Sequence, residues 1–498
     1  MTDAQPTTQA RTGPDRDALR AGVAGARVTV VGGARSGLAA ARLLARHGAG
    51  VFLTERGEAN GLAEALRQAG VAFETGGHTA RALDADWLVV SPGVPTSAPI
   101  VQSALRLRLP VFSEVEVASW FARGPVVAIT GSNGKTTTTS LVGHLFKTAG
   151  RAHVVAGNIG YAFADYADDV DEATAVVLEV SSFQLDHVAT FRPRVSVLLN
   201  VTPDHLDRYD HSVELYAAAK YRVFENAGPG DWLVYNHDDA AVRAAAEAHG
   251  AATPGVVLAP FSIETRLPVG AFVRPGPDGA EHVVLALPDP SALRDGAPTS
   301  PPNVIRTESF MPTADLALPG RHNLYNSLAA AIVARAMEIR SDVVRESLTS
   351  FEGVPHRLET VRTLGGVTYV NDSKATNVNA VWYALESFPG PPQGGRVVLI
   401  AGGKDKGNDY DPLKPLVAAK VAGVVAIGES AETVERELGP HAPRTVTAST
   451  MEEAIQFARL MAEPGDTVLL SPACASFDMF ENYEDRGDTF KRLVHALA

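Results

Sequence analysis

The sequence predicts an α/β protein of about three domains. Its 498 residues are enough for three domains at roughly 100–200 residues each. Short apolar segments alternate with helical segments in three successive blocks, the pattern of parallel sheets with helices on both faces. The middle block opens with a glycine-rich loop of the phosphate-binding type. Hydrophobic residues make up 45% of the chain and charged residues 20%, so each block can bury an ordinary core.

The first block begins at Arg27 and alternates strands with helices. Helical spacing over residues 36–48 stops at a glycine, a common helix end. Strands are predicted at residues 28–32, 51–55 and 87–95. This order indicates a parallel sheet.

The glycine turn after the first strand departs from a dinucleotide fingerprint. Residues 32–37 are Gly-Gly-Ala-Arg-Ser-Gly, with alanine where G-x-G-x-x-G has its middle glycine. Glu55, at the end of the second strand, is placed for an NAD ribose contact, but an imperfect match is weak evidence. A nicotinamide-dependent oxidoreductase is therefore an alternative that this turn disfavours.

The second block carries the phosphate loop and a long variable stretch. Its first strand leads into the loop, and further strands are predicted at residues 175–180 and 195–201. Residues 256–312 are rich in proline, glycine and charge, which favours the strands and loops of an insertion. A helical pattern returns at residues 326–337.

Residues 130–137, Thr-Gly-Ser-Asn-Gly-Lys-Thr-Thr, have the composition of a phosphate loop. The glycines let backbone N–H groups approach phosphate oxygens, and the following helix N-terminus adds partial positive charge. Lys135 suits the outer phosphates, and the Thr136 hydroxyl suits Mg²⁺. Only two residues separate the two glycines, fewer than in the usual G-x-x-x-x-G-K-[ST], so an ordinary glycine-rich turn is the alternative.

Three more residues of this block are candidates for chemistry. Glu179 ends an apolar strand, where a buried carboxylate needs a metal or, equally, a strand-end salt bridge. His205 follows the next strand, and ligands gather at the carboxyl ends of parallel strands, although Mg²⁺ prefers oxygen ligands. Lys220 lies in a helical pattern and, from the residues alone, is interpreted as a solvated lysine.

The third block begins near residue 356 and again alternates strands and helices. Its predicted strands are residues 367–370, 397–401, 424–427 and 467–471. The polar segments NDSKAT, GGKDKG and SPACAS each follow a strand, so parallel strands should bring them to one edge of one sheet. Their lysines and hydroxyls suit an anionic dicarboxylate, while each segment alone is equally compatible with a turn of small residues.

The composition disfavours several kinds of partner. A formal net charge of -13, from 57 acidic and 44 basic residues, argues against a general nucleic-acid binder. Cys474, the single cysteine, permits no intrachain disulfide and is interpreted as a packing residue. No apolar run reaches the ~20 residues of a membrane span, and the polar first 20 residues lack the core of a signal peptide. We therefore expect a cytoplasmic monomer without nucleic-acid or membrane partners.

Ten ordered segments, which begin at residue 128 and end at residue 487, make the chain resemble the Mur ligase family. They are AITGSNGKTT, AGNIG, LEVSSFQLD, LNVTPDHLDRY, YAAAKYRVFENA, PGRHNLYNSLAAA, GVPHRLE, NDSKATN, GGKDKG and LLSPACASFDMFENYEDRG. NDSKATN and SPACASFD resemble the D-glutamate-adding branch of the family. The implied reaction is the ATP-dependent addition of D-glutamate to UDP-N-acetylmuramoyl-L-alanine through an acyl phosphate, with Mg²⁺ as two ions.

The resemblance implies three domains with distinct ligands. The expected boundaries are 1–24 for a flexible extension, 25–114 for a Rossmann-like UDP-binding domain, 115–354 for a central P-loop ATP-binding α/β domain, and 355–498 for a Rossmann-like domain that binds the amino acid and ATP.

The resemblance also implies site residues. Those expected around ATP are Gly131, Ser132, Asn133, Gly134, Lys135, Thr136, Thr137, Asn326, Arg357 and Asp372. The metal site comprises Thr136, Glu179, His205 and Lys220, the last as its carbamate. The catalytic set is Lys135, His205 and Lys220, and His205 is a candidate base for the amine only if it is not a metal ligand. The UDP-substrate contacts are Arg35, Ser36, Thr54, Arg56, Ser91 and Asn158. The D-glutamate contacts are Lys374, Thr376, Lys406, Ser476, Phe477 and Tyr483, with Lys404 competing with Lys406 for the carboxylate.

Two further alternatives remain at this point. Folylpolyglutamate synthase shares the short phosphate loop and would use a folate and L-glutamate. A non-catalytic UDP-sugar sensor is the other, and the presence of Lys135, Glu179 and Lys220 disfavours it.

Overall fold

A computed structural model of the chain describes residues 15–58, 62–276, 279–289, 305–318, 320–391, 394–405 and 407–497. These residues form two compact units. The first contains the described residues up to Asp315 together with Tyr325–Thr349, and the second contains Leu316–Leu324 and the described residues from Ser350 onward. No helix within these ranges is long and apolar enough to cross a membrane.

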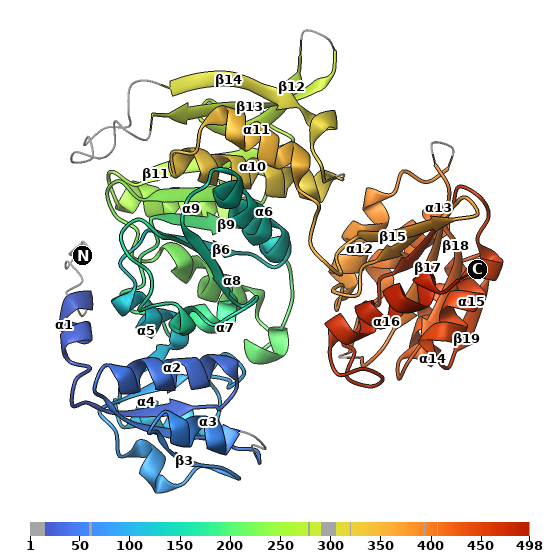
Figure 1. Cartoon of the computed structure of the whole chain (residues 1–498). Coiled ribbons are helices and arrows are strands. Elements are labelled where there is room, and N and C mark those ends of the chain that lie inside the picture. The colour runs from blue at the N-terminus through green and yellow to red at the C-terminus, as the bar shows by residue number, and fades with distance from the viewer. Residues whose placement is uncertain are drawn as a thin grey trace, which may run out of the picture. The chain divides into compact units, whose positions relative to one another are not determined.

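The first unit opens with a five-stranded parallel sheet in the order β3-β2-β1-β4-β5 (Figure 1, blue). Its strands are β1 (Arg27–Val31), β2 (Gly50–Thr54), β3 (Ala72–Glu74), β4 (Trp87–Val90) and β5 (Val111–Ser113). The helices are α2 (Arg35–Arg46), α3 (Leu62–Gln68), α4 (Pro99–Arg106) and α5 (Glu114–Phe121). The three predicted strands are confirmed. The two that the sequence pattern did not predict, β3 and β5, are three residues long.

Part of the expected flexible extension is a helix. α1 (Arg16–Ala21) begins after Asp15, whose side chain accepts a hydrogen bond from the backbone N–H of Asp17. Val23, which follows the helix, is buried. Residues 1–14 of the expected extension lie outside the described residues.

The central sheet of the first unit has nine strands in the order β14-β13-β12-β11-β10-β9-β6-β8-β7. The strands are β6 (Val126–Thr130), β7 (His153–Gly157), β8 (Ala175–Glu179), β9 (Val195–Leu198), β10 (Trp232–Asn236), β11 (Val257–Ser262), β12 (Gly270–Pro275), β13 (Glu281–Pro288) and β14 (Ile305–Pro312). The helices are α6 (Lys135–Thr148), α7 (Ser182–Leu185), α8 (Val213–Tyr221), α9 (Ala240–Ala252), α10 (Arg321–Ala336) and α11 (Ser341–Ser350). Strands β6 to β12 pair in parallel, and β13 and β14 add an antiparallel edge. The stretch predicted as strands and loops therefore supplies β11 to β14.

The second unit contains a six-stranded sheet in the order β15-β16-β20-β17-β18-β19. The strands are β15 (Glu359–Leu364), β16 (Val367–Asn371), β17 (Val397–Gly402), β18 (Val421–Ile427), β19 (Thr445–Ala448) and β20 (Thr467–Leu470). Its helices are α12 (Val378–Ser387), α13 (Lys414–Lys420), α14 (Ala431–Leu438), α15 (Met451–Met461) and α16 (Tyr483–His495). Only β15 pairs antiparallel, so the predicted doubly wound pattern is confirmed.

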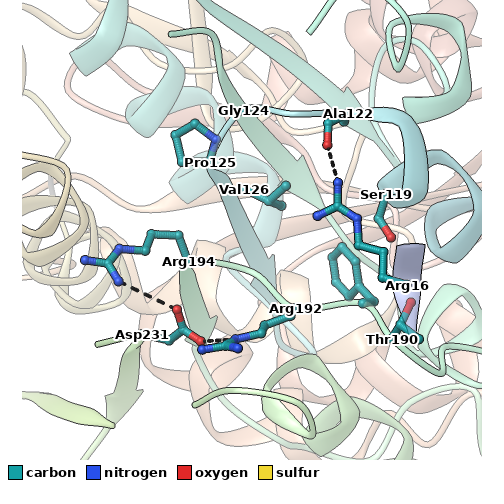
Figure 2. Close-up of a pocket in the computed structure, with 11 residues that line it drawn as sticks. Arg16, Ser119, Ala122, Gly124, Pro125, Val126, Thr190, Arg192, Arg194 and Asp231 are labelled. Atoms are coloured by element: carbon teal, nitrogen blue, oxygen red, sulfur yellow. Dashed lines mark hydrogen bonds and ion pairs between the residues drawn. The ribbon is translucent and has the colours of Figure 1, made fainter. Parts of the chain in front are cut away.

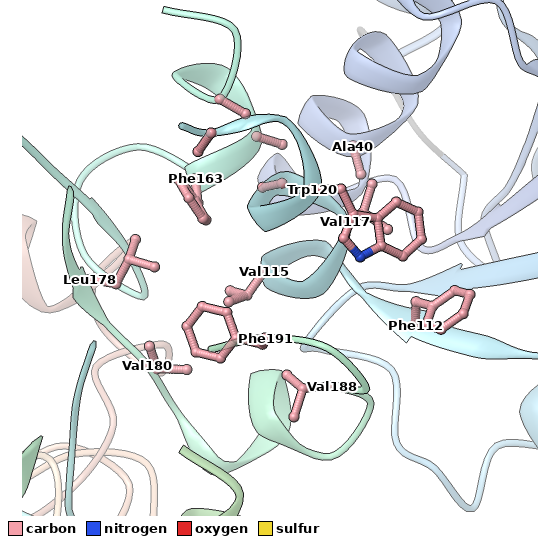
Figure 3. Packing of buried hydrophobic residues seen from close by; sticks show 14 of the residues in the cluster. Ala40, Phe112, Val115, Val117, Trp120, Phe163, Leu178, Val180, Val188 and Phe191 are labelled. Atoms are coloured by element: carbon pink, nitrogen blue, oxygen red, sulfur yellow. The ribbon is translucent and has the colours of Figure 1, made fainter. Parts of the chain in front are cut away.

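Helix α5 joins the first sheet to the central sheet through one hydrophobic cluster. Val115 and Trp120 of the helix lie between Phe112 of the first sheet and Phe163 and Phe191 of the central domain (Figure 3). At about 25 cal/mol per Å² of buried apolar surface, aromatic side chains of this size dominate such a contact. The two domains of the first unit therefore share a core.

Glu116 adds a polar clamp to this core. Its carboxylate accepts hydrogen bonds from the backbone N–H groups of Ala189, Thr190 and Phe191, each at 2.9 Å. It also accepts the indole N–H of Trp120 at 2.9 Å. A fully buried carboxylate with this many donors fixes the loop before β9 to helix α5.

Glu114, two residues earlier, is buried with fewer hydrogen bonds to its carboxylate than Glu116 has. One carboxyl oxygen accepts the N–H of Ala164 at 2.6 Å, and the other has no hydrogen-bond partner. Burial raises the pKa of Glu114 to about 7, despite the N–H of Ala164. The folded protein therefore holds a proton on Glu114 more tightly than the unfolded chain does.

We predict that Glu114→Gln stabilises the protein at high pH. The folded pKa lies above the ordinary 4.5, so the stability contributed by protonated Glu114 is complete below pH 4.5 and is lost as the pH rises through about 7. Glutamine carries no charge to desolvate. The variant should therefore gain on the order of 3 kcal/mol in unfolding free energy over the wild type at pH 8, and nothing at pH 4.

Denaturant unfolding across this pH range measures the difference. Glu172→Gln, at a position whose side chain is 73% exposed, is the control and should show no such rise. A difference in unfolding free energy between Glu114→Gln and the wild type that does not change with pH would contradict the raised pKa of Glu114.

Candidate active site

The predicted phosphate loop lies between β6 and α6. Gly134, the N-cap of α6, has φ +83°, and a Cβ atom there would lie 2.4 Å from Oδ1 of Asn326. Only glycine fits this left-handed, crowded position. The loop thus presents the N-terminus of a 14-residue helix, a favourable site for phosphate groups.

Hydrogen bonds from the neighbouring β9 loop fix the shape of the phosphate loop. The Asn133 N–H donates to Oδ1 of Asn200 at 2.8 Å, and the Asn200 amide donates back to the Asn133 carbonyl at 3.1 Å. The Ser132 hydroxyl donates to the Thr202 carbonyl at 2.8 Å. These contacts pre-form the loop, since β6 and β9 are paired neighbours.

Asn326 and three threonines complete the wall behind the loop. Asn326 is buried on α10 and accepts the hydroxyl of Thr138 at 3.2 Å. Thr136 and Thr137 are buried in the first turn of α6, and Oγ1 of Thr137 has no hydrogen-bond partner. The structure therefore places these predicted residues together.

Lys220 is buried against the phosphate loop, which overturns its interpretation as a solvated lysine. Its side chain is 1% exposed, and its Nζ donates to the Gly131 carbonyl at 2.9 Å. Nζ also lies 4.5 Å from the centre of the Tyr216 ring. Burial, and then the charge of Lys135, lowers the pKa of Lys220 well below its ordinary value. The ammonium form is therefore less stable here than on an exposed lysine.

Lys135 shares this carbonyl with Lys220. Its Nζ donates to the carbonyls of Gly131 at 2.9 Å and Ser132 at 2.8 Å. Two lysine nitrogens therefore meet on one carbonyl oxygen. This concentration of positive charge suits a polyphosphate.

Glu179 ends β8 beside the phosphate loop, because β8 pairs in parallel with β6. It is buried, and one carboxyl oxygen accepts the amide of Asn158 at 2.8 Å. The other oxygen has no hydrogen-bond partner. The strand-end salt bridge considered from the sequence is absent from the ion pairs of the described residues, and Asn158 takes its place.

His205 is less enclosed than Glu179. It has φ +51°, its side chain is 44% exposed, and Nε2 lies 3.7 Å from Oδ2 of Asp204. Its ring contacts Phe183 edge-on. Within the described ranges, no three His, Cys, Asp or Glu side chains form a ready metal cluster. Any metal here must therefore also use hydroxyl or other oxygen atoms.

Five of the six predicted UDP contacts lie at the carboxyl edge of the first sheet, whereas Asn158 follows β7 of the central sheet, and the six residues differ in exposure. Thr54 and Ser91 are buried, and their hydroxyls bind protein groups: Thr54 donates to Glu74 at 2.7 Å, and Ser91 donates to the Gly32 carbonyl at 2.9 Å. The remaining predicted contacts, Arg35, Ser36, Arg56 and Asn158, are at least partly exposed. Glu55, the residue considered for an NAD ribose, accepts the N–H of Gly33 at 2.6 Å and braces the glycine turn.

Two arginines link the first domain to the catalytic loops. Arg35 donates to the carbonyl of Gly160, in the loop that carries Asn158. Arg208, three residues after His205, donates to the Pro92 and Val94 carbonyls at 3.2 Å each. Arg208 was not among the sequence predictions. The sequence around Arg208 gives no sign of this role, because its partners are backbone carbonyls more than 100 residues away.

The second unit brings three predicted loops to one sheet edge. The loops that contain Lys374, Lys404 and Ser476 follow β16, β17 and β20, which are parallel neighbours. Lys404 and Ala475 pair through their backbones. Nζ of Lys374 donates to the Tyr483 hydroxyl at 2.9 Å. The predicted convergence is confirmed.

Other predicted residues of this edge vary in exposure. Ser476 is buried, Phe477 is 69% exposed, and Thr376 is half-buried. Lys406 lies outside the described residues. Asp372 is buried and accepts the hydroxyl of Ser471 at 2.7 Å. Burial raises the pKa of Asp372 to about 6, and the charge of Arg357 opposes this rise.

Arg486 is a buried cation that the sequence interpretation missed. Its guanidinium donates to the hydroxyl and carbonyl of Ser373 at 2.9 and 2.8 Å, and to the Cys474 carbonyl at 3.2 Å. It thus ties the Lys374 loop to the Ser476 loop. A signal was present, since an arginine in the first turn of a helix opposes the helix dipole.

Protein-family models match the chain in three consecutive segments. They are a "Mur ligase MurD-like, N-terminal domain" at residues 26–113, a "Mur ligase middle domain" at 129–334 and a "Mur ligase, glutamate ligase domain" at 356–474. Solved structures under 20% identical share the fold. UDP-N-acetylmuramate-alanine ligase MurC of Thermotoga maritima has 17% identity and a TM-score of 0.56, covering 95% of this chain and 99% of its own. MurF ligase of the same organism, in complex with ADP, has 18% identity and a TM-score of 0.55. The match covers 90% of this chain and 96% of the MurF chain.

The chain belongs to the Mur ligase family and has its three-domain fold. Curated relatives narrow the comparison to one branch. A protein of Salinibacter ruber is 61% identical over 95% of this chain and 98% of its own length. A protein of Chloroherpeton thalassium is 44% identical over 95% of this chain and 99% of its own length. Both are named UDP-N-acetylmuramoylalanine–D-glutamate ligase.

We predict that Arg486→Met destabilises the second unit by about 3–5 kcal/mol. The substitution leaves several buried carbonyl and hydroxyl groups without their donor, and buried polar groups are costly when unpaired. Calorimetric or denaturant unfolding measures the loss. Arg492→Met, at an exposed position of the same helix, is the control and should change stability by less than about 0.5 kcal/mol. Equal stability of the two variants would contradict the role of Arg486.

Proposed function

We propose that this chain joins D-glutamate to UDP-N-acetylmuramoyl-L-alanine at the expense of ATP, a step of peptidoglycan precursor synthesis. The observation that carries the proposal is the full-length identity of 61% to a ligase of that name, together with the phosphate loop and buried Lys220. The convergent lysine and hydroxyl loops of the second unit support a dicarboxylate amino acid. We place the reaction in the cytoplasm and expect a monomer.

The first step forms an acyl phosphate. The terminal carboxylate of the UDP-linked substrate attacks the γ-phosphorus of ATP, a carbon-bound oxygen gains the phosphoryl group, and ADP leaves. Two anions approach each other in this step. Lys135, at the N-terminus of α6, lowers that repulsion and orients the phosphates.

The second step forms the amide. The amine of D-glutamate attacks the acyl carbon, the amide bond forms, and inorganic phosphate leaves. The amine must lose a proton, and His205, whose side chain is 44% exposed, is the candidate base if it is not a metal ligand. A protein nucleophile is not needed, and Cys474 remains a buried packing residue.

The residues of the phosphate loop fit Mg²⁺, which we propose as two ions. Glu179 offers an unpartnered carboxylate oxygen and Thr136 a hydroxyl at the same strand ends, and Mg²⁺ prefers oxygen ligands. When bound, Mg²⁺ neutralises phosphate charge. His205 would supply nitrogen, an unusual ligand for this metal.

We propose that Lys220 carries a carbamate. A neutral amine reacts with CO₂ to give an N-carboxylate and a proton, so the buried side chain becomes an anion with two oxygens. The burial of Lys220 and its contact with the Gly131 carbonyl support this, because a lysine kept as a cation here would face Lys135. The carbamate then supplies oxygen to the metal site.

The remaining assignments follow the same proposal. ATP contacts are the loop residues with Asn326, Arg357 and Asp372. The UDP substrate is assigned to the first domain, residues 25–114, with the partly exposed Arg35, Ser36 and Arg56 as its stronger contacts. Residues 115–354 bind ATP and residues 355–498 bind the amino acid. A lysine of the GGKDKG loop, Lys406 or its competitor Lys404, pairs with a carboxylate of D-glutamate.

We predict ATP-dependent product formation that requires both cosubstrates. The purified protein is incubated with ATP, Mg²⁺, UDP-N-acetylmuramoyl-L-alanine and D-glutamate, and phosphate release and product mass are measured. The product should gain one glutamate residue from the D-isomer alone. Parallel mixtures contain L-glutamate, diaminopimelate, or a folate with L-glutamate. Turnover of the folate mixture would move the chain to folylpolyglutamate synthase activity, and silence in every mixture would refute ligase function.

We predict that Lys220→Ala loses at least about 100-fold in kcat and regains part of it with added short-chain carboxylates. The substitution removes the carbamate oxygens, and a small carboxylate can occupy the space left beside Gly131. Lys147→Ala, at an exposed position of α6, is the control and should keep full activity without any response to carboxylates. Full activity of Lys220→Ala would sink the carbamate assignment.

A further inference from the structure

A cavity of about 130 Å³ lies at the opposite end of the central sheet from the phosphate loop (Figure 2). Its lining includes Pro125 and Val126 at the start of β6, Arg194 just before β9, and Asp231 just before β10. The phosphate loop follows the other end of β6. Five strand residues, at about 3.3 Å each, separate the two places. The cavity is therefore distinct from the candidate active site.

The charge of this cavity is opposite to that of the chain. Three arginines line it, Arg16 from α1 and Arg192 and Arg194 from the loop before β9, against the single acid Asp231. The lining residues thus carry a net charge of +2 in a protein whose formal charge is -13. A concave surface of one sign concentrates ions of the other sign.

Asp231 neutralises only part of this charge. It accepts Nε of Arg192 at 2.6 Å, while Nη1 of Arg194 stays 3.7 Å from its other oxygen, beyond hydrogen-bond distance. Arg16 donates to the Ala122 carbonyl at 2.8 Å and forms no ion pair within the described part of the chain. Arg16 and Arg194 therefore keep charge and N–H donors for a further anion.

The cavity wall is held in place by the shared core. The Glu116 clamp fixes Thr190 and Phe191 directly before Arg192. Gly228 leaves room for the Arg192 guanidinium, since a Cβ atom there would lie 2.7 Å from Nη2. Because this wall is already ordered, little free energy of binding is lost to rearranging it.

We propose that this cavity binds a phosphoryl group. The guanidinium donors come from two elements, Arg16 from α1 and Arg192 and Arg194 from the loop before β9, and they lie on different sides of the cavity (Figure 2). A phosphate presents oxygens tetrahedrally and can accept from several directions, whereas a carboxylate presents two oxygens in one plane. The group is either free phosphate, which the proposed ligase reaction releases, or the phosphate of a small metabolite.

Equilibrium dialysis with radioactive inorganic phosphate tests this. The protein is first saturated with Mg²⁺ and the β,γ-methylene analogue of ATP, so that the phosphate loop is filled. We expect one phosphate per chain to bind. Arg16→Gln with Arg194→Gln should weaken binding by at least about tenfold, since each removes charge-assisted hydrogen bonds. Arg16→Gln alone, on an exposed helix, keeps the test valid if the double variant fails to fold.

Control variants and competing ligands show whether the bound group is a phosphoryl group and whether it belongs to free phosphate or to a metabolite. Arg20→Gln, on the same helix but outside the cavity, should leave binding unchanged. Displacement by UMP or a sugar phosphate at lower concentration than phosphate itself would assign a metabolite, and failure to displace would assign free phosphate. No bound phosphate, equal binding by the double variant, or equal displacement by acetate would overturn the proposal.

Discussion

The meeting of two lysines on one backbone carbonyl is the constraint around which the catalytic half of the first unit is arranged. Lys135 and Lys220 both donate to the Gly131 oxygen at 2.9 Å. Two ammonium groups on one oxygen repel each other strongly away from bulk water. Burial and the charge of Lys135 lower the pKa of Lys220, and the concentration of positive charge favours anions at this place. Phosphate groups and a carbamate on Lys220 are both anions of this kind.

The rest of the first unit holds this arrangement in place. The Asn133–Asn200 pair fixes the loop. Asn158 donates to one oxygen of Glu179, and the other oxygen has no hydrogen-bond partner. Arg35 and Arg208 anchor the first domain to the same loops through backbone carbonyls. Helix α5 and the Glu116 clamp join the two sheets into one core. The first sheet, with the predicted UDP contacts at its edge, and the phosphate loop are thereby parts of a single folded unit.

The sequence predicted features that depend on local pattern and on the rules of parallel sheets. The phosphate loop follows from its glycines and flanking elements, and the convergence of the Lys374, Lys404 and Ser476 loops follows from their places after parallel strands. Burial of Lys220 could not be predicted from the residues, since it depends on a carbonyl 89 residues away. The family resemblance instead assigned Lys220 to the metal site as a carbamate, and that assignment stays a prediction.

Other features were hidden for different physical reasons. Strands β3 and β5 are too short to show periodicity, and α1 depends on its cap and on Val23 rather than on an apolar stripe. Arg208 binds backbone carbonyls, which leave no trace in residue type. The arginine cavity joins α1 to loops more than 100 residues away.

The state of Lys220 is the central claim, and ¹³C NMR of the whole protein under ¹³CO₂ tests it most directly. We expect one carbamate carbon resonance per chain in the wild type and its loss in Lys220→Arg, which keeps the charge but cannot form the same carbamate. A wild-type spectrum without that resonance, or a resonance that persists in Lys220→Arg, would contradict the account.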